Sequence, residues 1–89
     1  MKDSEDDRQT KTLLIVDDDD AFRNSLTRAM EKRGYEVTAL GSVGEAQQLA
    51  PALRPKFAVV DLRMPDGNGL DVVQALRRAC DSTLSLIHI

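Results

Sequence analysis

Residues 56–69 have the sequence KFAVVDLRMPDGNG, which is the strongest indication of the fold in this chain. The apolar residues 57–60 run without interruption into Asp61, and a cluster of Pro, Asp, Gly and Asn residues follows. Such a run is typical of a strand that is buried on both faces of a parallel sheet. The cluster behind it predicts a loop that leaves the carboxyl end of the strand. Ligands bind at this edge of open parallel sheets, so Asp61 is a candidate functional residue.

A second apolar run near the start of the chain also ends in acidic residues. Residues 12–16 are TLLIV, and aspartates occupy positions 17–20. A single Asp behind a strand is usually a turn residue or a helix cap. Two acidic strand ends in one parallel sheet favour a shared site, because parallel strands bring their carboxyl ends to the same edge.

Apolar residues at helical or alternating spacing fill the rest of the chain. The spacing predicts helices over residues 21–33, 42–50 and 70–79, and a short strand over residues 35–40. In the first helix Arg23 is expected on the solvent face, opposite Phe22. The elements therefore alternate strand and helix three times. Right-handed crossovers convert this order into an α/β doubly wound parallel sheet with helices on both faces.

Capping residues indicate where these helices begin and end. Asp19 or Asp20 can cap the first helix, and Gly34 is its expected stop. Residues 42–45, Ser-Val-Gly-Glu, have the spacing of a capping box. Pro51 is expected to end the second helix.

The two ends of the chain differ from this pattern. Residues 1–11 are mostly charged and are predicted to be a disordered tail. Residues 84–89, LSLIHI, could form a fourth strand. The same letters are also the translation of CTG TCT CTT ATA CAC ATC, which resembles the mosaic end of a transposon used to make sequencing libraries. We therefore interpret 84–89 as a non-native read-through tail and assign His88 no role.

Length and composition restrict the class of protein. A chain of 89 residues forms at most one small domain. Its net charge of −3, with both signs interspersed, gives no support to binding of nucleic acid or an anionic membrane. The single cysteine excludes an internal disulfide. Without a membrane-length apolar run or a signal region, we expect a cytoplasmic location.

Asp17, Asp18 and Asp61 converge if the strands that precede them lie side by side. Two carboxylates about 4 Å apart repel by roughly 4 kcal/mol at an effective dielectric near 20, so three of them need protons or a cation. Oxygen ligands that are few in number suit Mg²⁺ better than zinc. Bound Mg²⁺ could bridge a carboxylate and a phosphoryl oxygen, which favours phosphoryl transfer with Asp61 as the nucleophile.

These motifs resemble the receiver domain of bacterial two-component response regulators. Residues 13–18, LLIVDD, look like that family's first strand and acidic pair. Residues 57–69 look like its phosphoacceptor strand and the loop behind it. The finer pattern of residues 30–34 and 61–73 is similar to the redox-responsive RegA/PrrA/ActR group.

The resemblance implies a flavodoxin-like (CheY-like) fold with five strands in the order 2-1-3-4-5. It implies that Asp61 accepts a phosphoryl group from a sensor histidine kinase. It also implies Mg²⁺ bound by Asp18, Asp61 and the backbone carbonyl of Arg63, with Asp17 contributing largely through water. The chain would then be a phosphoacceptor signalling domain and not an enzyme.

The resemblance covers residues 12–83, the first three strands and their helices. The switch Ser/Thr and the Lys that end the family's fourth and fifth strands have no counterpart, nor has the face used for dimerisation and output. We therefore expect a C-terminally truncated receiver that binds no nucleic acid itself. Its longer parent would control transcription through a DNA-binding domain of the Fis helix-turn-helix type.

Two alternatives remain. A haloacid-dehalogenase-type phosphohydrolase would use Asp17 as nucleophile and Asp19 as acid, but Ala21 stands where that family has Thr or Val. Substitution separates the two, because Asp61→Asn should abolish phosphoryl uptake in a receiver and Asp17→Asn should do so in the hydrolase. The second alternative is a non-functional fragment, molten or aggregating because the strand at 57–60 and the helix at 70–79 would expose apolar faces.

Overall fold

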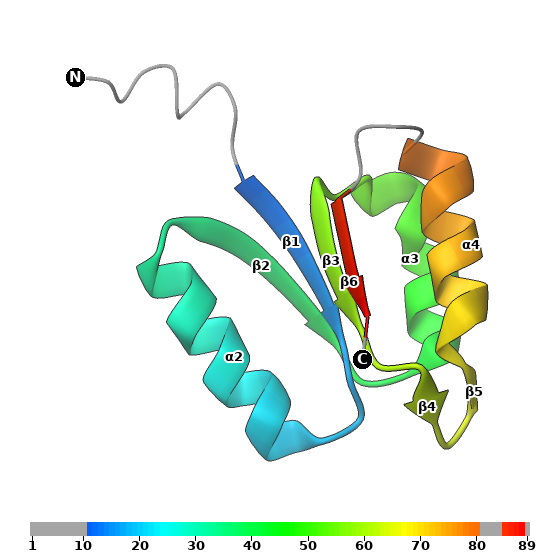
Figure 1. Cartoon of the computed structure of the whole chain (residues 1–89), viewed down its shortest axis with the longest axis horizontal. Helices are drawn as coiled ribbons and strands as arrows, with labels where there is room; N and C mark the ends of the chain where they lie inside the picture. Colours follow the sequence, from blue (N-terminus) through cyan, green and yellow to red (C-terminus); the bar gives the residue numbers. More distant parts are fainter. Residues whose placement is uncertain (1–10, 81–84, 89) are drawn as a thin grey trace.

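The computed structural model describes residues 11–80 and 85–88, with side chains described for residues 11–79. Strands and helices alternate along most of this length (Figure 1). Their bounds are β1 (Lys11–Val16), α2 (Asp20–Lys32), β2 (Tyr35–Leu40), α3 (Val43–Leu53), β3 (Phe57–Val60), β4 (Arg63–Met64), β5 (Gly67–Asn68), α4 (Gly69–Cys80) and β6 (Ser85–His88). None of the described helices is long and apolar enough to cross a membrane.

The main sheet has the strand order β2-β1-β3-β6, and all its neighbours are parallel. Figure 1 shows α2 on one side of this sheet and α3 and α4 together on the other side. The predicted α/β doubly wound architecture is therefore confirmed. The apolar run of β1 has buried side chains on both faces, from Leu13 to Val16, as is typical of a parallel strand between covered faces.

The ends of the chain are described only in part. Lys11 belongs to β1, so this strand begins one residue earlier than predicted. The rest of the predicted tail, residues 1–10, lies outside the described residues. Residues 85–88 form β6 beside β3, as the fourth-strand alternative required, with Phe57 paired to Ser85. The non-native origin of residues 84–89 stays a prediction, and residues 84 and 89 lie outside the described part.

The hydrophobic core lies between the sheet and the α3–α4 pair. Alternate residues of β1 and β3 point into it, and α3 and α4 supply the facing side chains. Its buried members are Leu14, Val16, Val43, Ala46, Ala50, Ala58, Val60, Met64, Val72, Val73 and Leu76. The same cluster contains the last residues of β1 and β3, Val16 and Val60, together with Val43 of α3.

The other face of the sheet is covered less completely. Leu13 and Ile15 of β1 are buried there, but Phe57 and Val59 of β3 are only half-buried. The prediction that β3 is buried on both faces is wrong in this respect. Among the described elements only α2 packs on this face, and it lies mainly over β2. For the same reason α2 has no fully buried residue, and Phe22 stays 40% exposed.

Two of the predicted caps are confirmed and one predicted stop is wrong. The Asp19 side chain accepts a hydrogen bond from the Phe22 N–H, and Ser42 Oγ accepts one from the Glu45 N–H. Pro51 does not end α3, which continues to Leu53. A proline lacks an N–H and crowds the carbonyl one turn before it, but the residues after it can still donate: the Arg54 N–H bonds to the Ala50 carbonyl at 3.2 Å.

The loop predicted behind Asp61 contains a short hairpin. Its strands β4 and β5 pair antiparallel, with Met64 opposite Gly67. The Met64 side chain is 7% exposed and belongs to the core, which ties the hairpin to the body of the domain.

Candidate functional site

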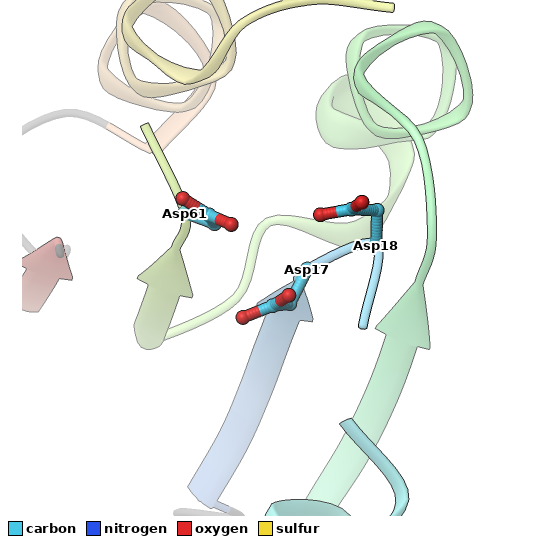
Figure 2. A group of neighbouring side chains, drawn as sticks. All are labelled: Asp17, Asp18 and Asp61. Carbon is cyan, nitrogen blue, oxygen red and sulfur yellow. The ribbon is translucent and has the colours of Figure 1, made fainter. Parts of the chain in front are cut away.

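The three predicted carboxylates meet at the carboxyl edge of the sheet. Asp17 and Asp18 follow β1, and Asp61 follows β3. These strands are neighbours, and Val16 pairs with Val60 at their carboxyl ends. Asp17 and Asp61 are the next residues of the two strands and therefore lie at the same level of the sheet. One oxygen from each carboxylate lies within 4.8 Å of the others (Figure 2). The predicted convergence of Asp17, Asp18 and Asp61 is confirmed.

Asp17 lies at the base of this acidic cluster. It is the one buried charged residue among the described side chains, at 8% exposure. Its N–H donates to the Leu40 carbonyl at 3.1 Å, and its Oδ1 accepts the Asp19 N–H at 2.9 Å. Asp18, by contrast, is exposed. A cation at this edge would thus contact the fixed carboxylate of Asp17 on the protein side and the exposed carboxylate of Asp18 on the solvent side.

Asp61 is half-buried, and hydrogen bonds hold both its backbone and its side chain. Its N–H donates to the Val16 carbonyl at 2.9 Å, which continues the β1–β3 pairing by one residue. Its Oδ1 accepts the N–H of Arg63 at 2.9 Å. The carboxylate is therefore oriented by the first residue of the hairpin and remains accessible from solvent.

The donor set fits a hard divalent cation. All three side chains offer carboxylate oxygen, the ligand type that Mg²⁺ and Ca²⁺ prefer. Among residues 11–79, no lysine or arginine forms an ion pair with Asp17, Asp18 or Asp61. In this part of the chain none of the three carboxylates has a direct cationic side-chain partner, so a bound metal ion would reduce their mutual repulsion.

Arg63, the fourth predicted metal ligand, has a defined place beside the cluster. It follows Asp61 by two residues, in β4, and its N–H points at the Asp61 carboxylate. The predicted role concerns its carbonyl oxygen instead. That role stays a prediction.

Arg23 links α2 to the end of β1, a contact that the sequence pattern did not predict. It was expected on the solvent face of its helix, yet its side chain is only 18% exposed. Nη1 donates to the Asp17 carbonyl oxygen at 2.7 Å, and Nη2 pairs with Asp20 Oδ1 at 2.5 Å. The helical pattern could not show this, because the long side chain turns back toward the end of β1.

Asp66 was also missed as a site residue. Its two carboxylate oxygens accept the N–H groups of Val43 and Gly44, at 3.1 and 3.2 Å. The hydrogen bond from the Val43 N–H, and next that from Gly44, lowers the pKa of Asp66 from its ordinary value of 3.8. No local signal could have found this contact, because the partners are 22 and 23 residues away.

The geometry does not favour the phosphohydrolase alternative. Asp19, its proposed acid, is exposed, and its Oδ1 accepts the Phe22 N–H at 3.1 Å as the cap of α2. It is not a member of the acidic cluster, whereas Asp61, which that alternative leaves without a role, is one.

Comparison with known proteins points to one family. The sequence profile of the response regulator receiver domain matches residues 13–89. The photosynthetic apparatus regulatory protein RegA of Cereibacter sphaeroides is 54% identical over 67 residues, which are 75% of this chain and 36% of RegA. The acid tolerance regulatory protein ActR of Rhizobium meliloti is 51% identical over 77 residues, 86% of this chain and 40% of ActR. This chain therefore spans well under half the length of these relatives.

The solved structures that superpose on this chain are also response regulators. A receiver domain from Methanospirillum hungatei superposes with a TM-score of 0.80 at 28% identity, covering 89% of this chain and 62% of that one. A response regulator from Burkholderia pseudomallei superposes with a TM-score of 0.79 at 31% identity, covering 88% of this chain and 45% of that one. The latter structure contains a phosphorylated aspartic acid and a calcium ion.

Proposed function

Because this chain belongs to the response regulator receiver domains of two-component systems, we propose that Asp61 is its phosphoacceptor and that the donor is a phosphorylated sensor histidine kinase. The observation that carries the proposal is the position of the Asp61 carboxylate. It is half-buried at the carboxyl edge of the sheet, within 4.8 Å of two further carboxylates, and oriented by the Arg63 N–H.

In the proposed reaction an oxygen of the Asp61 carboxylate attacks the phosphorus of a phosphohistidine. The new oxygen–phosphorus bond forms as the phosphorus–nitrogen bond breaks. The leaving imidazole keeps the electron pair of the broken bond and takes up a proton from solvent. The product is an acyl phosphate on Asp61, which the protein needs only to position and stabilise electrostatically.

We further propose that Asp17, Asp18, Asp61 and the Arg63 carbonyl hold Mg²⁺. When bound, the ion supplies positive charge that offsets the negative charge of the phosphoryl oxygens and of the acidic cluster. The buried Asp17 keeps its position through the bonds to Leu40 and Asp19, while Asp18 stays open to solvent. Asp17 thus provides a carboxylate in a fixed position, and the side of the site at Asp18 is accessible to the reacting groups.

The relatives suggest what the phosphorylated domain controls. RegA and ActR are named as regulatory proteins, and the response regulator MtrA of Mycolicibacterium smegmatis, 32% identical, is named as DNA-binding. We propose that this receiver likewise controls transcription through a DNA-binding domain in a longer protein.

The test uses phosphoramidate as the donor, because its phosphorus–nitrogen bond is that of a phosphohistidine. With Mg²⁺ present, intact-mass measurement should show the gain of one phosphoryl group, and peptide mapping should locate it on Asp61. The Asp61→Asn variant should gain none. Asp71→Asn removes the same charge from the exposed first turn of α4 and should react like the unsubstituted chain.

Two results would contradict the proposal. One is a phosphoryl group that maps to a residue other than Asp61 and persists in Asp61→Asn. The other is a chain with a native circular dichroism spectrum that takes up no phosphoryl group at any Mg²⁺ concentration. Uptake that survives removal of Mg²⁺ with a chelator would contradict the metal site alone.

A further inference from the structure

A long-range contact joins the hairpin behind Asp61 to the first turn of α3. Asp66, between β4 and β5, accepts the Val43 N–H through Oδ1 and the Gly44 N–H through Oδ2. The two distances, 3.1 and 3.2 Å, are ordinary hydrogen-bond lengths, and each oxygen has its own donor. Charge-assisted bonds of this kind are about twice as strong as neutral ones.

Apolar packing supports the same contact. A Cβ placed on Gly67 would lie 3.2 Å from Cγ1 of Val43, so β5 passes tightly over this side chain. Val43 is 4% exposed and shares the core with Met64 of β4. The hairpin is thus held on α3 by polar bonds at its turn and by packing along its strands.

Both partners of this contact lead directly to the acidic cluster. In the hairpin, the Arg63 N–H donates to Asp61 Oδ1 at 2.9 Å. On the other side, α3 follows β2 after two residues, and the carbonyl of Leu40, the last residue of β2, accepts the Asp17 N–H at 3.1 Å. Asp66 therefore connects the hairpin that orients Asp61 with the helix that follows the strand end bonded to Asp17.

We propose that Asp66 is a positioning residue for phosphoryl uptake, because its bonds to Val43 and Gly44 keep the hairpin where the Arg63 N–H orients the Asp61 carboxylate. This inference rests on the function proposed above for Asp61. Asp66 touches neither the reacting oxygen nor the acidic cluster, so it acts through Arg63.

A role for Asp66 in capping α3 alone makes a different prediction from a role in positioning Asp61. The first turn of α3 already has its own cap, since Ser42 Oγ accepts the Glu45 N–H at 3.1 Å. If Asp66 only capped the helix further, its removal would weaken α3 and leave the Arg63–Asp61 bond unchanged. The Arg63 amide is therefore the group whose behaviour separates the two roles.

The test compares Asp66→Ala and Asp66→Asn with the unsubstituted chain. We expect Asp66→Ala to lower Mg²⁺ affinity and the rate of phosphorylation by phosphoramidate about tenfold, the lower end of the range for outer-shell partners of metal ligands. Asp66→Asn keeps one acceptor and should recover part of the rate. Hydrogen exchange should accelerate at Arg63 as well as at Val43 and Gly44.

Two controls remove trivial explanations. Asp71→Ala deletes an exposed carboxylate on α4 and tests for a general charge effect. Leu13→Ala weakens the opposite face of the sheet, outside the core cluster that contains Val43 and Met64, and tests for a general loss of stability. Both should keep the Mg²⁺ affinity and the phosphorylation rate within about twofold, as expected for sites that share no partner with Asp66.

The proposal is overturned if Asp66→Ala is phosphorylated at the unsubstituted rate, or if Leu13→Ala at equal stability slows phosphorylation as much. It is also overturned if exchange rises at Val43 and Gly44 but not at Arg63. Failure of the unsubstituted chain to take up phosphoryl groups would instead defeat the function proposed for Asp61. The exchange data at Arg63 would still report on the contact itself.

Discussion

Gly69 lies closer to Asp61 than any residue with a Cβ atom could. A Cβ built on Gly69 would come within 2.2 Å of the Asp61 carbonyl oxygen and 2.7 Å of the Leu62 Cα. Gly69 is buried, and its N–H donates to the Leu62 carbonyl at 3.3 Å as α4 begins. The helix therefore starts directly against the backbone of the phosphoacceptor candidate, because position 69 has no side chain.

Gly69→Ala should destabilise the protein by about 1–3 kcal/mol, since the atoms it meets are backbone atoms that can move only with Asp61. The same shift should slow phosphorylation. Gly44→Ala is the matched control, because its Cβ would meet only Asp66 Oδ2 at 3.9 Å. It should be neutral or stabilise α3 by roughly 0.5–1 kcal/mol. Urea unfolding measures both, and equal effects would contradict the close contact.

Mg²⁺ should stabilise the folded chain through the acidic cluster. Ligand present at a hundred times its dissociation constant adds about 2.7 kcal/mol to the free energy of unfolding. Asp18→Asn should reduce this gain, because it removes one of the three clustered carboxylates. Asp71→Asn should keep it. A melting temperature that stays constant through a Mg²⁺ titration of the unsubstituted chain would contradict the metal site.

Acid should weaken the contact between Asp66 and α3. The pKa of Asp66 is lower in the folded protein than its ordinary value of 3.8, so the unfolded chain binds the proton more tightly. The stabilisation is therefore complete above that ordinary value and is lost as the pH falls through the folded pKa. Unfolding free energies measured from roughly pH 5 to about pH 2.5 should converge for the unsubstituted chain and Asp66→Asn. Parallel curves would show that Asp66 does not contribute.

Arg23 should stabilise the junction between β1 and α2. Arg23→Met keeps most of the apolar stem but removes the donors to the Asp17 carbonyl and to Asp20. We expect a loss of about 1.5 kcal/mol, typical of a hydrogen bond from a charged group. Arg28→Met, on an exposed position of the same helix, is the control and should change stability by less than about 0.5 kcal/mol. Equal losses would show that Arg23 acts only as a general charge.

The sequence predicted the features that depend on local periodicity. The strand at 35–40 was predicted with the bounds that β2 has, and the caps at Asp19 and Ser42 are where the pattern placed them. Where a neighbour mattered, the prediction was less accurate. Phe22 is exposed because α2 packs mainly on β2. The helix α3 continues past Pro51 because the next residues still bond to it, as the Arg54 N–H does to the Ala50 carbonyl.

The position of carboxylates at the carboxyl ends of two apolar strands follows from the order of residue types along the chain. Parallel pairing then brings Asp17, Asp18 and Asp61 together, since the register of neighbouring strands leaves no other edge for them. The residues that support this cluster depend instead on long-range packing. Asp66 bonds to a helix that begins 23 residues earlier in the chain, and Gly69 contacts the Asp61 carbonyl. Such contacts follow from the way loops pack in space, and no local spacing of residue types records them.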